Sequence, residues 1–168
     1  MTDVDSATVA LVGHEGLSGV PALFAVRTTL LRHTVLLDGE ALRLGTRELI
    51  ALLRTMPTLK ISVCRYARAL LEQIANRAAC NQFHEVRKRV VFWLLMIRER
   101  TEAEIVPITH EALAEMLGCR RASVTQALRS LEAVGSLHCG RGYIRFVNGK
   151  LLQENTCECY STLAQLPV

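Results

Sequence analysis

Residues 109–147 read THEALAEMLGCRRASVTQALRSLEAVGSLHCGRGYIRFV. They combine two short amphipathic patterns, a glycine between them and a glycine-rich stretch after them. Thr109 can cap the first helix through its hydroxyl, and Leu113 and Leu117 give that helix an apolar stripe. Gly118 can adopt the left-handed conformation that a sharp helix end needs. This order of elements predicts a winged helix-turn-helix, a fold that reads DNA.

The second helix of this pattern, expected over about 120–135, has one apolar and one polar face. Apolar residues that recur at helical spacing are expected to face inward. These residues are Val124, Ala127, Leu128, Leu131 and Val134. After it, residues 137–139 and 143–147 are predicted as strands around Gly140-Arg141-Gly142. The tip of this hairpin would present Arg141 to the phosphate backbone.

The polar face and its surroundings carry the side chains that we expect to contact DNA. They are Thr109, Arg120, Arg121, Ala122, Ser123, Thr125, Gln126, Arg129 and Arg141. Arginine can donate two hydrogen bonds to guanine, glutamine can pair with the adenine edge, and hydroxyl groups can reach phosphates. Taken singly, Arg121 and Arg129 are better explained as solvated surface charges, and Gln126 alone indicates nothing. The prediction depends on their combination on one face.

This segment resembles the DNA-binding domain of the Crp/Fnr family of bacterial transcription regulators. Asn81-Gln82-Phe83-His84, the segment from Arg87 to Arg100 and the closing Cys157-Glu158-Cys159-Tyr160 extend the resemblance, which covers residues 9–160. It implies a sequence-specific regulator that binds a palindromic operator in double-stranded DNA as a homodimer, with the helix at about 120–135 in the major groove. It also implies RNA polymerase as a partner.

Two positions depart from the cyclic-AMP receptor type within that family. Ala122 stands where that type has an acidic residue, and Gln126 stands where it has an arginine. Glutamine pairs with adenine, whereas arginine pairs with guanine. We therefore expect a different operator, with adenine favoured at the pair that Gln126 contacts.

Residues 57–81 predict one long helix with Pro57 in its first turn. Apolar residues recur along it near heptad spacing and form what we call the predicted stripe. The stripe consists of Leu59, Val63, Tyr66, Leu70 and Ile74. From periodicity alone, packing on the chain's own sensor domain and pairing with a second copy explain it equally well. The resemblance favours pairing, because family members dimerise along this helix and place two readers about 34 Å apart. A second helix is expected from Glu85 to about Arg98, with Trp93 in the core.

Residues 7–44 alternate between β-rich segments and turns. They resemble the later strands of the family's cyclic-nucleotide-binding β-roll, but a complete roll would need more strands before residue 7. We therefore expect a truncated β-roll, due either to the assigned start codon or to a natural half-sensor. Four residues lie near the family's ligand positions and are possible ligand contacts: Glu15, Gly16, Arg27 and Thr28. Because their register differs, we favour plain turns with Glu15 in solvent.

The expected fold class is α+β, in four parts. They are a partial β-roll sensor at 1–56, a dimerisation helix at 57–81, a winged helix-turn-helix at 82–160 and a tail at 161–168. The alternative to a DNA-binding homodimer is a shortened family member that pairs with a full-length relative and modulates it.

Composition narrows the function classes. Half of the 168 residues are hydrophobic and the net charge is +4, which argues against disorder and suits a polyanionic partner. No export signal or membrane-spanning run is visible, so we expect a cytoplasmic protein with no membrane partner. No nucleophile with a base, paired carboxylates or metal quartet stands out. We expect neither an enzyme nor a cofactor.

Six cysteines without an export signal are expected to be reduced thiols. Cys157 and Cys159 form a CxC pair that offers two soft ligands, but no second close pair completes a tetrahedral site. Family members that sense oxygen through an iron–sulfur cluster mostly carry its cysteines near the N-terminus, where this chain has no matching group. We therefore expect no metal.

Overall fold

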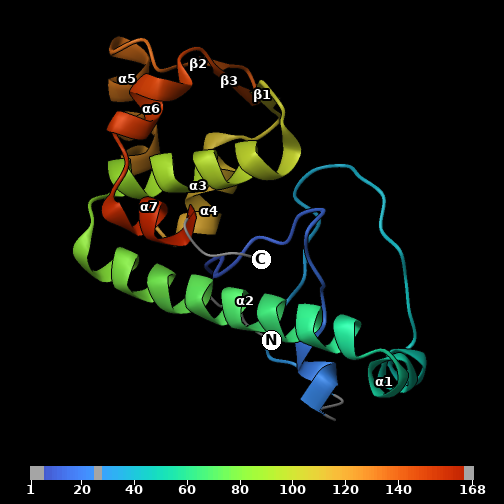
Figure 1. Ribbon diagram of the computed structural model, residues 1–168. Coiled ribbons are helices and arrows are strands. Elements are labelled where there is room, and N and C mark those ends of the chain that lie inside the picture. Colours follow the sequence, from blue (N-terminus) through green and yellow to red (C-terminus); the bar gives the residue numbers. More distant parts are fainter. Residues whose placement is uncertain (1–5, 25–27, 165–168) are drawn as a thin grey trace.

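The long helix α2, Pro57–Phe83, is the axis along which the other elements are arranged (Figure 1). The structure is a computed structural model and describes residues 6–24 and 28–164. Pro57 suits the first turn of α2 because its fixed φ is helical and its missing N–H would have no partner there. The helix ends where His84 turns to an extended conformation, with φ −114° and ψ 141°. The long helix predicted over residues 57–81 is confirmed.

Helix α3, Val86–Thr101, follows directly and forms the centre of the hydrophobic core. Eight consecutive residues, 90–97, are buried, including Trp93 with none of its surface exposed. A helix that is apolar all round must be covered on every side. Helices α4, α5 and α6 contact α3, and Tyr160 meets the Phe92 ring edge-on at 6.5 Å between centroids.

The C-terminal part folds as a small α+β domain around α3. Its elements in chain order are β1 (Ile105–Val106), α4 (His110–Leu117), α5 (Arg121–Ala133), β2 (Leu137–Gly140), β3 (Tyr143–Phe146), α6 (Gly149–Glu154) and α7 (Glu158–Ala164). The three strands form one antiparallel sheet in the order β1-β3-β2. The hairpin of β2 and β3 confirms the predicted wing, whereas β1 is too short to give a recognisable alternation.

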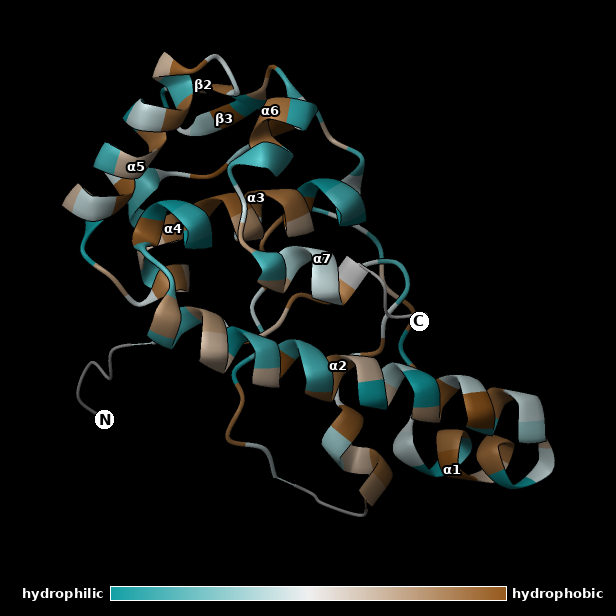
Figure 2. Cartoon of the chain, turned by 60° about the vertical axis from the view of Figure 1, so that its left-hand side comes forward, coloured by the Kyte–Doolittle hydropathy of each residue, from teal (hydrophilic) through white to brown (hydrophobic). Residues whose placement is uncertain are grey.

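Helix α7 lies between α2 and α3 in both ribbon views (Figures 1 and 2), and its contact with α2 is direct. It occupies residues that the sequence assigned partly to a tail at 161–168. The helix continues to Ala164, and residues 165–168 lie outside the described residues. The C-terminal helix therefore belongs to the junction between the long helix and the core.

The strands expected between residues 7 and 44 are not formed in the described residues 6–24 and 28–44, which corrects the predicted truncated β-roll. This part has a short 3-10 helix η1, Val20–Phe24, and is followed by helix α1, Thr46–Thr55. A strand needs a neighbouring strand for its backbone hydrogen bonds. Here the backbone bonds to helices instead: Thr8 N donates to the Met116 carbonyl at 2.8 Å and Leu11 N to Gln73 Oε1 at 3.1 Å. The α+β class and the winged helix-turn-helix are confirmed.

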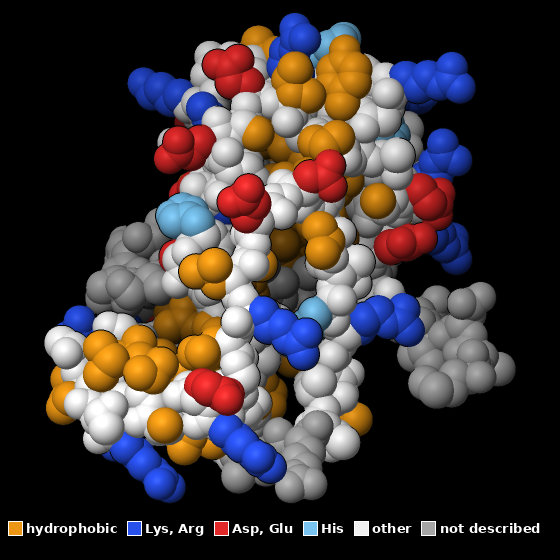
Figure 3. Space-filling model, turned by 90° about the vertical axis from the view of Figure 1, so that its right-hand side faces the viewer, with side chains coloured by type: hydrophobic (Ala, Val, Ile, Leu, Met, Phe, Trp, Pro, Cys, Tyr) orange, Lys and Arg blue, Asp and Glu red, His pale blue; other side chains and the backbone are white. Residues whose placement is uncertain are grey.

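Large hydrophobic side chains stay exposed on the N-terminal part, including Leu30, Leu42, Leu44 and Leu52. Figure 3 views the side of the molecule on which α1 lies and shows hydrophobic side chains gathered at its lower left. In the part of the chain that the structure describes, no helix combines the length and apolar character that a membrane span requires.

Candidate nucleic-acid interface

The turn between α4 and α5 has the geometry that the sequence predicts. The hydroxyl oxygen of Thr109 accepts a hydrogen bond from Ala112 N at 3.1 Å and so caps α4. Gly118 ends that helix in the left-handed region, at φ 58° and ψ 46°. Thr109, which we expect to contact DNA, keeps its hydroxyl hydrogen and a second lone pair for a further partner. The short turn holds α5 across α4 in a fixed orientation.

Helix α5 has the two faces that its sequence indicates. Four of the five residues expected to face inward are buried: Val124, Ala127, Leu128 and Leu131. The side chains exposed on α5 include Arg121, Ala122, Gln126 and Arg129. Helix α5 lies at the margin of the molecule in Figures 1 and 2. Its outer face is therefore open to a large partner.

The inward position predicted for Val134 is wrong. Helix α5 ends at Ala133, so Val134 is the capping residue and 48% of it is exposed. Gly135 follows with φ 75° and turns the chain toward β2. The helical periodicity therefore held only up to the last turn.

Two polar contacts tie α4 to the start of α5. His110 Nδ1 lies 3.0 Å from Thr125 Oγ1, and Arg121 Nε lies 3.6 Å from Glu111 Oε2. Desolvation, together with the nearby arginines, lowers the pKa of His110, so its ring is mainly neutral at pH 7. The exposed Arg121–Glu111 pair contributes less than about 1 kcal/mol. Arg121 can therefore exchange Glu111 for a stronger partner at little cost.

Of the other positions expected to contact DNA, Arg120 is exposed and precedes α5, where its carbonyl accepts from Ser123 N at 3.0 Å. Ser123 and Thr125 are half-buried. Arg141 is exposed at the hairpin tip beside Gly142, which has φ 83°. The structure thus places Arg120, Arg121, Gln126 and Arg129 in one helix region and Arg141 on a separate element.

The wing is fastened to α5 by Glu132. Its Oε1 accepts from Cys139 N at 3.0 Å and contacts His138 Nδ1 at 2.8 Å. The hydrogen bond from the Cys139 backbone is the main reason why the pKa of Glu132 lies below its usual value. The hairpin is therefore tethered to α5 by two contacts of one side chain.

Two further arginines lie on or against the helix-turn-helix and its wing, and the sequence did not indicate their positions. Arg89 of α3 donates to the Leu117 carbonyl and so satisfies the C-terminal end of α4. Arg145 is exposed on β3 opposite His138 in the register. Arg145 lies between the apolar residues Ile144 and Phe146, and this alternation along a strand could have predicted that its side chain is exposed.

The possible ligand contacts near the N-terminus are not placed as one set in the described residues. Glu15 forms an ion pair with Arg100 Nε at 3.0 Å rather than lying in solvent. Gly16 packs against α2, where a Cβ would lie 2.7 Å from Tyr66 Oη. Thr28 is exposed, and Arg27 lies outside the described residues.

The predicted stripe of α2 lies largely against the chain itself. Tyr66 is buried and its other four members are half-buried. A second set of residues on α2, which we call the exposed stripe, is open to solvent. It consists of Ile61, Cys64, Leu71, Ala75 and Ala78.

The fold and the exposed face of α5 define the class of protein: this is a winged helix-turn-helix protein. Residues 88–154 match the Crp-like helix-turn-helix domain. The chain is 26% identical over 147 residues to the cyclic AMP receptor protein of Thermus thermophilus, a match that covers 88% of this chain and 68% of that protein. Residues 88–154 therefore form a Crp-like helix-turn-helix domain, and the resemblance to the Crp/Fnr family is confirmed.

Solved structures have the same fold. FixK2 from Bradyrhizobium japonicum has a TM-score of 0.59 at 17% identity, over 67% of this chain and 59% of that one. A transcriptional regulator of the Crp/Fnr family from Thermus thermophilus has a TM-score of 0.53 at 23% identity, over 62% and 55%. The match thus spans little more than half the length of these two structures.

Proposed function

We propose that this chain is a sequence-specific DNA-binding regulator of transcription that places α5 in the major groove. The observation that carries the proposal is the outer face of α5, where Arg121, Gln126 and Arg129 are exposed opposite a fully apolar inner face. A recognition helix needs one face packed firmly against its own domain and the opposite face open to the DNA groove. The Crp-like domain match supports the same assignment.

The side chains divide into two roles in this proposal. Arg121 and Gln126, in the first half of α5, read base edges, because the N-terminal part of a recognition helix enters the groove. Arg129 and Arg141 lie on two different elements and contact phosphates on either side of that groove. Base contacts set the preferred sequence, and phosphate contacts set most of the affinity.

Replacing Gln126 by arginine tests the base-reading role. We expect Gln126→Arg to move the preference at the contacted base pair from adenine to guanine, because arginine pairs bidentately with guanine. The measurement is selection of bound sequences from a random duplex pool. Gln82→Arg on α2 adds the same charge at another exposed glutamine and should leave the preference unchanged. An identical preference in wild type and Gln126→Arg would contradict the assignment.

We further propose that the DNA-bound form is a homodimer paired along α2. One helix-turn-helix alone binds weakly, whereas two readers about 34 Å apart fit successive turns of a palindromic site. The exposed stripe supports this arrangement, since its residues recur with the heptad spacing of a coiled coil. Arg68, which pairs with Glu72 at 2.6 Å, occupies the skipped position. The predicted stripe is less available because Tyr66 is covered by the chain's own N-terminal part.

Cys64 provides a direct test of this pairing because it is exposed on the stripe. In a parallel pair of helices, Cys64 would face its own copy, so mild oxidation should give a covalent dimer that Cys64→Ser abolishes. Leu71→Glu should weaken dimerisation by about tenfold or more and reduce DNA binding with it. Denaturing gels detect the covalent dimer, and light scattering measures dimerisation of the Leu71→Glu variant. A monomer at concentrations that saturate DNA, or DNA binding only after a longer relative is added, would contradict the homodimer.

A further inference from the structure

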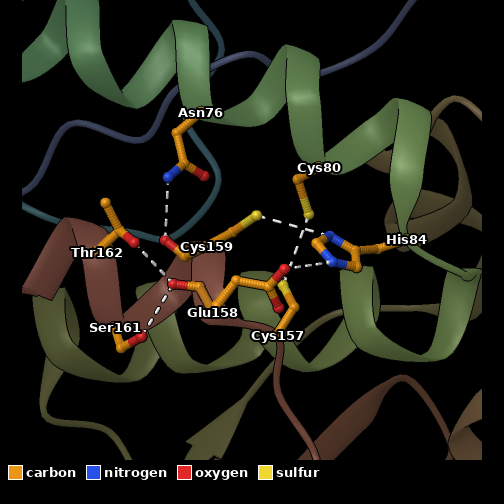
Figure 4. A network of polar contacts seen from close by, with 8 residues as sticks. All are labelled: Asn76, Cys80, His84, Cys157, Glu158, Cys159, Ser161 and Thr162. Atoms are coloured by element: carbon orange, nitrogen blue, oxygen red, sulfur yellow. Dashed lines mark hydrogen bonds and ion pairs between the residues drawn. The ribbon is translucent and has the colours of Figure 1, made fainter.

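Four side chains with metal-binding atoms meet where α2 approaches α7 (Figure 4). Cys80 and His84 lie on and just after the last turn of α2, and Cys157 and Cys159 flank the first residue of α7. Their sulfur and imidazole nitrogen atoms all lie within 4.8 Å of one another. The three cysteines are buried, and the side chain of His84 is 13% exposed. The cluster is thus closed to bulk water.

Two of the six distances between ligand atoms in this cluster already match the edges of a single tetrahedral site, and the others are no longer than 4.8 Å. Cys80 Sγ lies 3.7 Å from Cys157 Sγ, and Cys159 Sγ lies 3.5 Å from His84 Nδ1. Zinc–sulfur bonds of about 2.3 Å and zinc–nitrogen bonds of about 2.0–2.1 Å give tetrahedron edges of about 3.5–3.8 Å. We propose that Cys80, His84, Cys157 and Cys159 bind one thiophilic divalent cation, with zinc as the ion that this ligand set suits best.

The imidazole of His84 is oriented as a metal ligand requires. Its Nε2 lies 3.2 Å from Glu158 Oε1, so this nitrogen can donate its hydrogen to the carboxylate. The lone pair of Nδ1 then points toward the sulfur atoms (Figure 4). Ligating histidines regularly have such a carboxylate partner on the opposite nitrogen. The main chain is also held, because Asn76 Nδ2 donates to the Cys159 carbonyl at 3.2 Å.

A buried positive charge beside the cluster supports the same conclusion. Arg77 is only 1% exposed, and its guanidinium lies over two neighbouring aromatic rings, 4.6 Å from the Phe92 centroid and 4.7 Å from that of Trp93. Among the described residues no carboxylate forms an ion pair with it, and its Nε and Nη1 have no hydrogen-bond partner. The thiols of the cluster lie within its electrostatic range. Three thiolates around a divalent ion carry one net negative charge, which would compensate the guanidinium.

Binding would join two segments that are far apart in the chain. The ion replaces the three thiol protons, which are released to solvent, and links the end of α2 to the start of α7. The same end of α2 leads through His84 and Glu85 into α3 and the helix-turn-helix. The site would therefore fix the angle at which the long helix meets the DNA-reading part.

Metal content of the full chain tests the site. The protein, purified under reducing conditions and dialysed, is expected to retain about one zinc per chain by elemental analysis. Cobalt(II) should give the intense visible bands of a tetrahedral ion and a thiolate charge-transfer band. Cys80→Ser and Cys159→Ser should lose both the retained zinc and the cobalt spectrum, whereas Cys64→Ser, the matched control, should keep both. His84→Cys should retain zinc, because four cysteines also form a tetrahedral zinc site, and His84→Ala should not.

A further variant avoids disturbing the core. Glu158 is 76% exposed, so Glu158→Ala should leave the fold intact while weakening zinc binding by about tenfold. Circular dichroism checks the fold of every variant, and DNA binding is measured separately. Four results would overturn the proposal: no retained metal, an equal loss in Cys64→Ser, a Cys80–Cys157 disulfide in a chain that takes up no zinc, or iron with acid-labile sulfide.

Discussion

Arg129→Ala combined with Arg141→Ala is expected to weaken DNA binding on the order of 100-fold at moderate salt and to flatten its salt dependence. Both side chains are exposed, one on the outer face of α5 and one at the hairpin tip. Each lost phosphate contact lowers the slope of log affinity against log salt by about 0.9. Two contacts per chain in a homodimer therefore reduce the slope by about 3.6. Titrations of labelled duplex at several salt concentrations measure it.

The matched control for this pair is Arg47→Ala with Arg54→Ala. Both arginines are exposed on α1, outside the proposed DNA interface. Replacing them removes the same two positive charges as the test variant. We expect its salt slope to equal that of the wild-type chain. If the two double variants behaved alike, the loss would reflect net charge alone and the proposed phosphate contacts would be wrong. Arg121→Ala should instead relax sequence preference, because base contacts carry specificity.

The buried and exposed faces of α5 could be predicted from sequence almost residue by residue, because helical periodicity is a local property. Val124, Leu128 and Leu131 are buried as expected, and Gly118 ends α4 in the left-handed region. The inward position predicted for Val134 is wrong because periodicity does not reveal where a helix stops. One residue past the end of the helix, its side chain no longer points inward.

The structure of the N-terminal part could not be predicted from local sequence patterns. A β-rich sequence forms strands only when other strands lie beside it, and pairing is decided by the whole fold. In the described residues the segment bonds instead to Met116 and Gln73, on two helices distant in sequence. For α2, periodicity located apolar residues, but the neighbouring segments determined that Tyr66 is covered and Leu71 is exposed.

The cysteine and histidine cluster was missed for the same reason. Cys80 and Cys157 are 77 positions apart, so only the packing of α7 against α2 brings them together. One local signal was present nevertheless. Cys80 and His84 are separated by four positions, which places them on one face of a helix. A cysteine–histidine pair at that spacing, combined with a CxC elsewhere, could have indicated a fourfold ligand set.

Trp93→Ala is expected to have the largest effect on stability, lowering the free energy of unfolding by about 3–5 kcal/mol. The side chain has none of its surface exposed, and its ring lies edge-to-face with Phe92 at 5.8 Å between centroids. It is also one of the two aromatic rings over which the Arg77 guanidinium lies. Truncation would leave a cavity and remove part of the surface against which this buried guanidinium packs.

Trp93→Phe separates these contributions. It keeps an aromatic face for Arg77 and removes the indole Nε1, which has no hydrogen-bond partner among the described residues. We expect a loss of less than half that of alanine. Because Trp93 is the single tryptophan of the chain, urea unfolding must be followed by far-ultraviolet circular dichroism rather than fluorescence. Val134→Ala, at a half-exposed position, should change stability by no more than about 0.5 kcal/mol. Equal losses in Trp93→Ala and Val134→Ala would contradict the central position of α3 in the core.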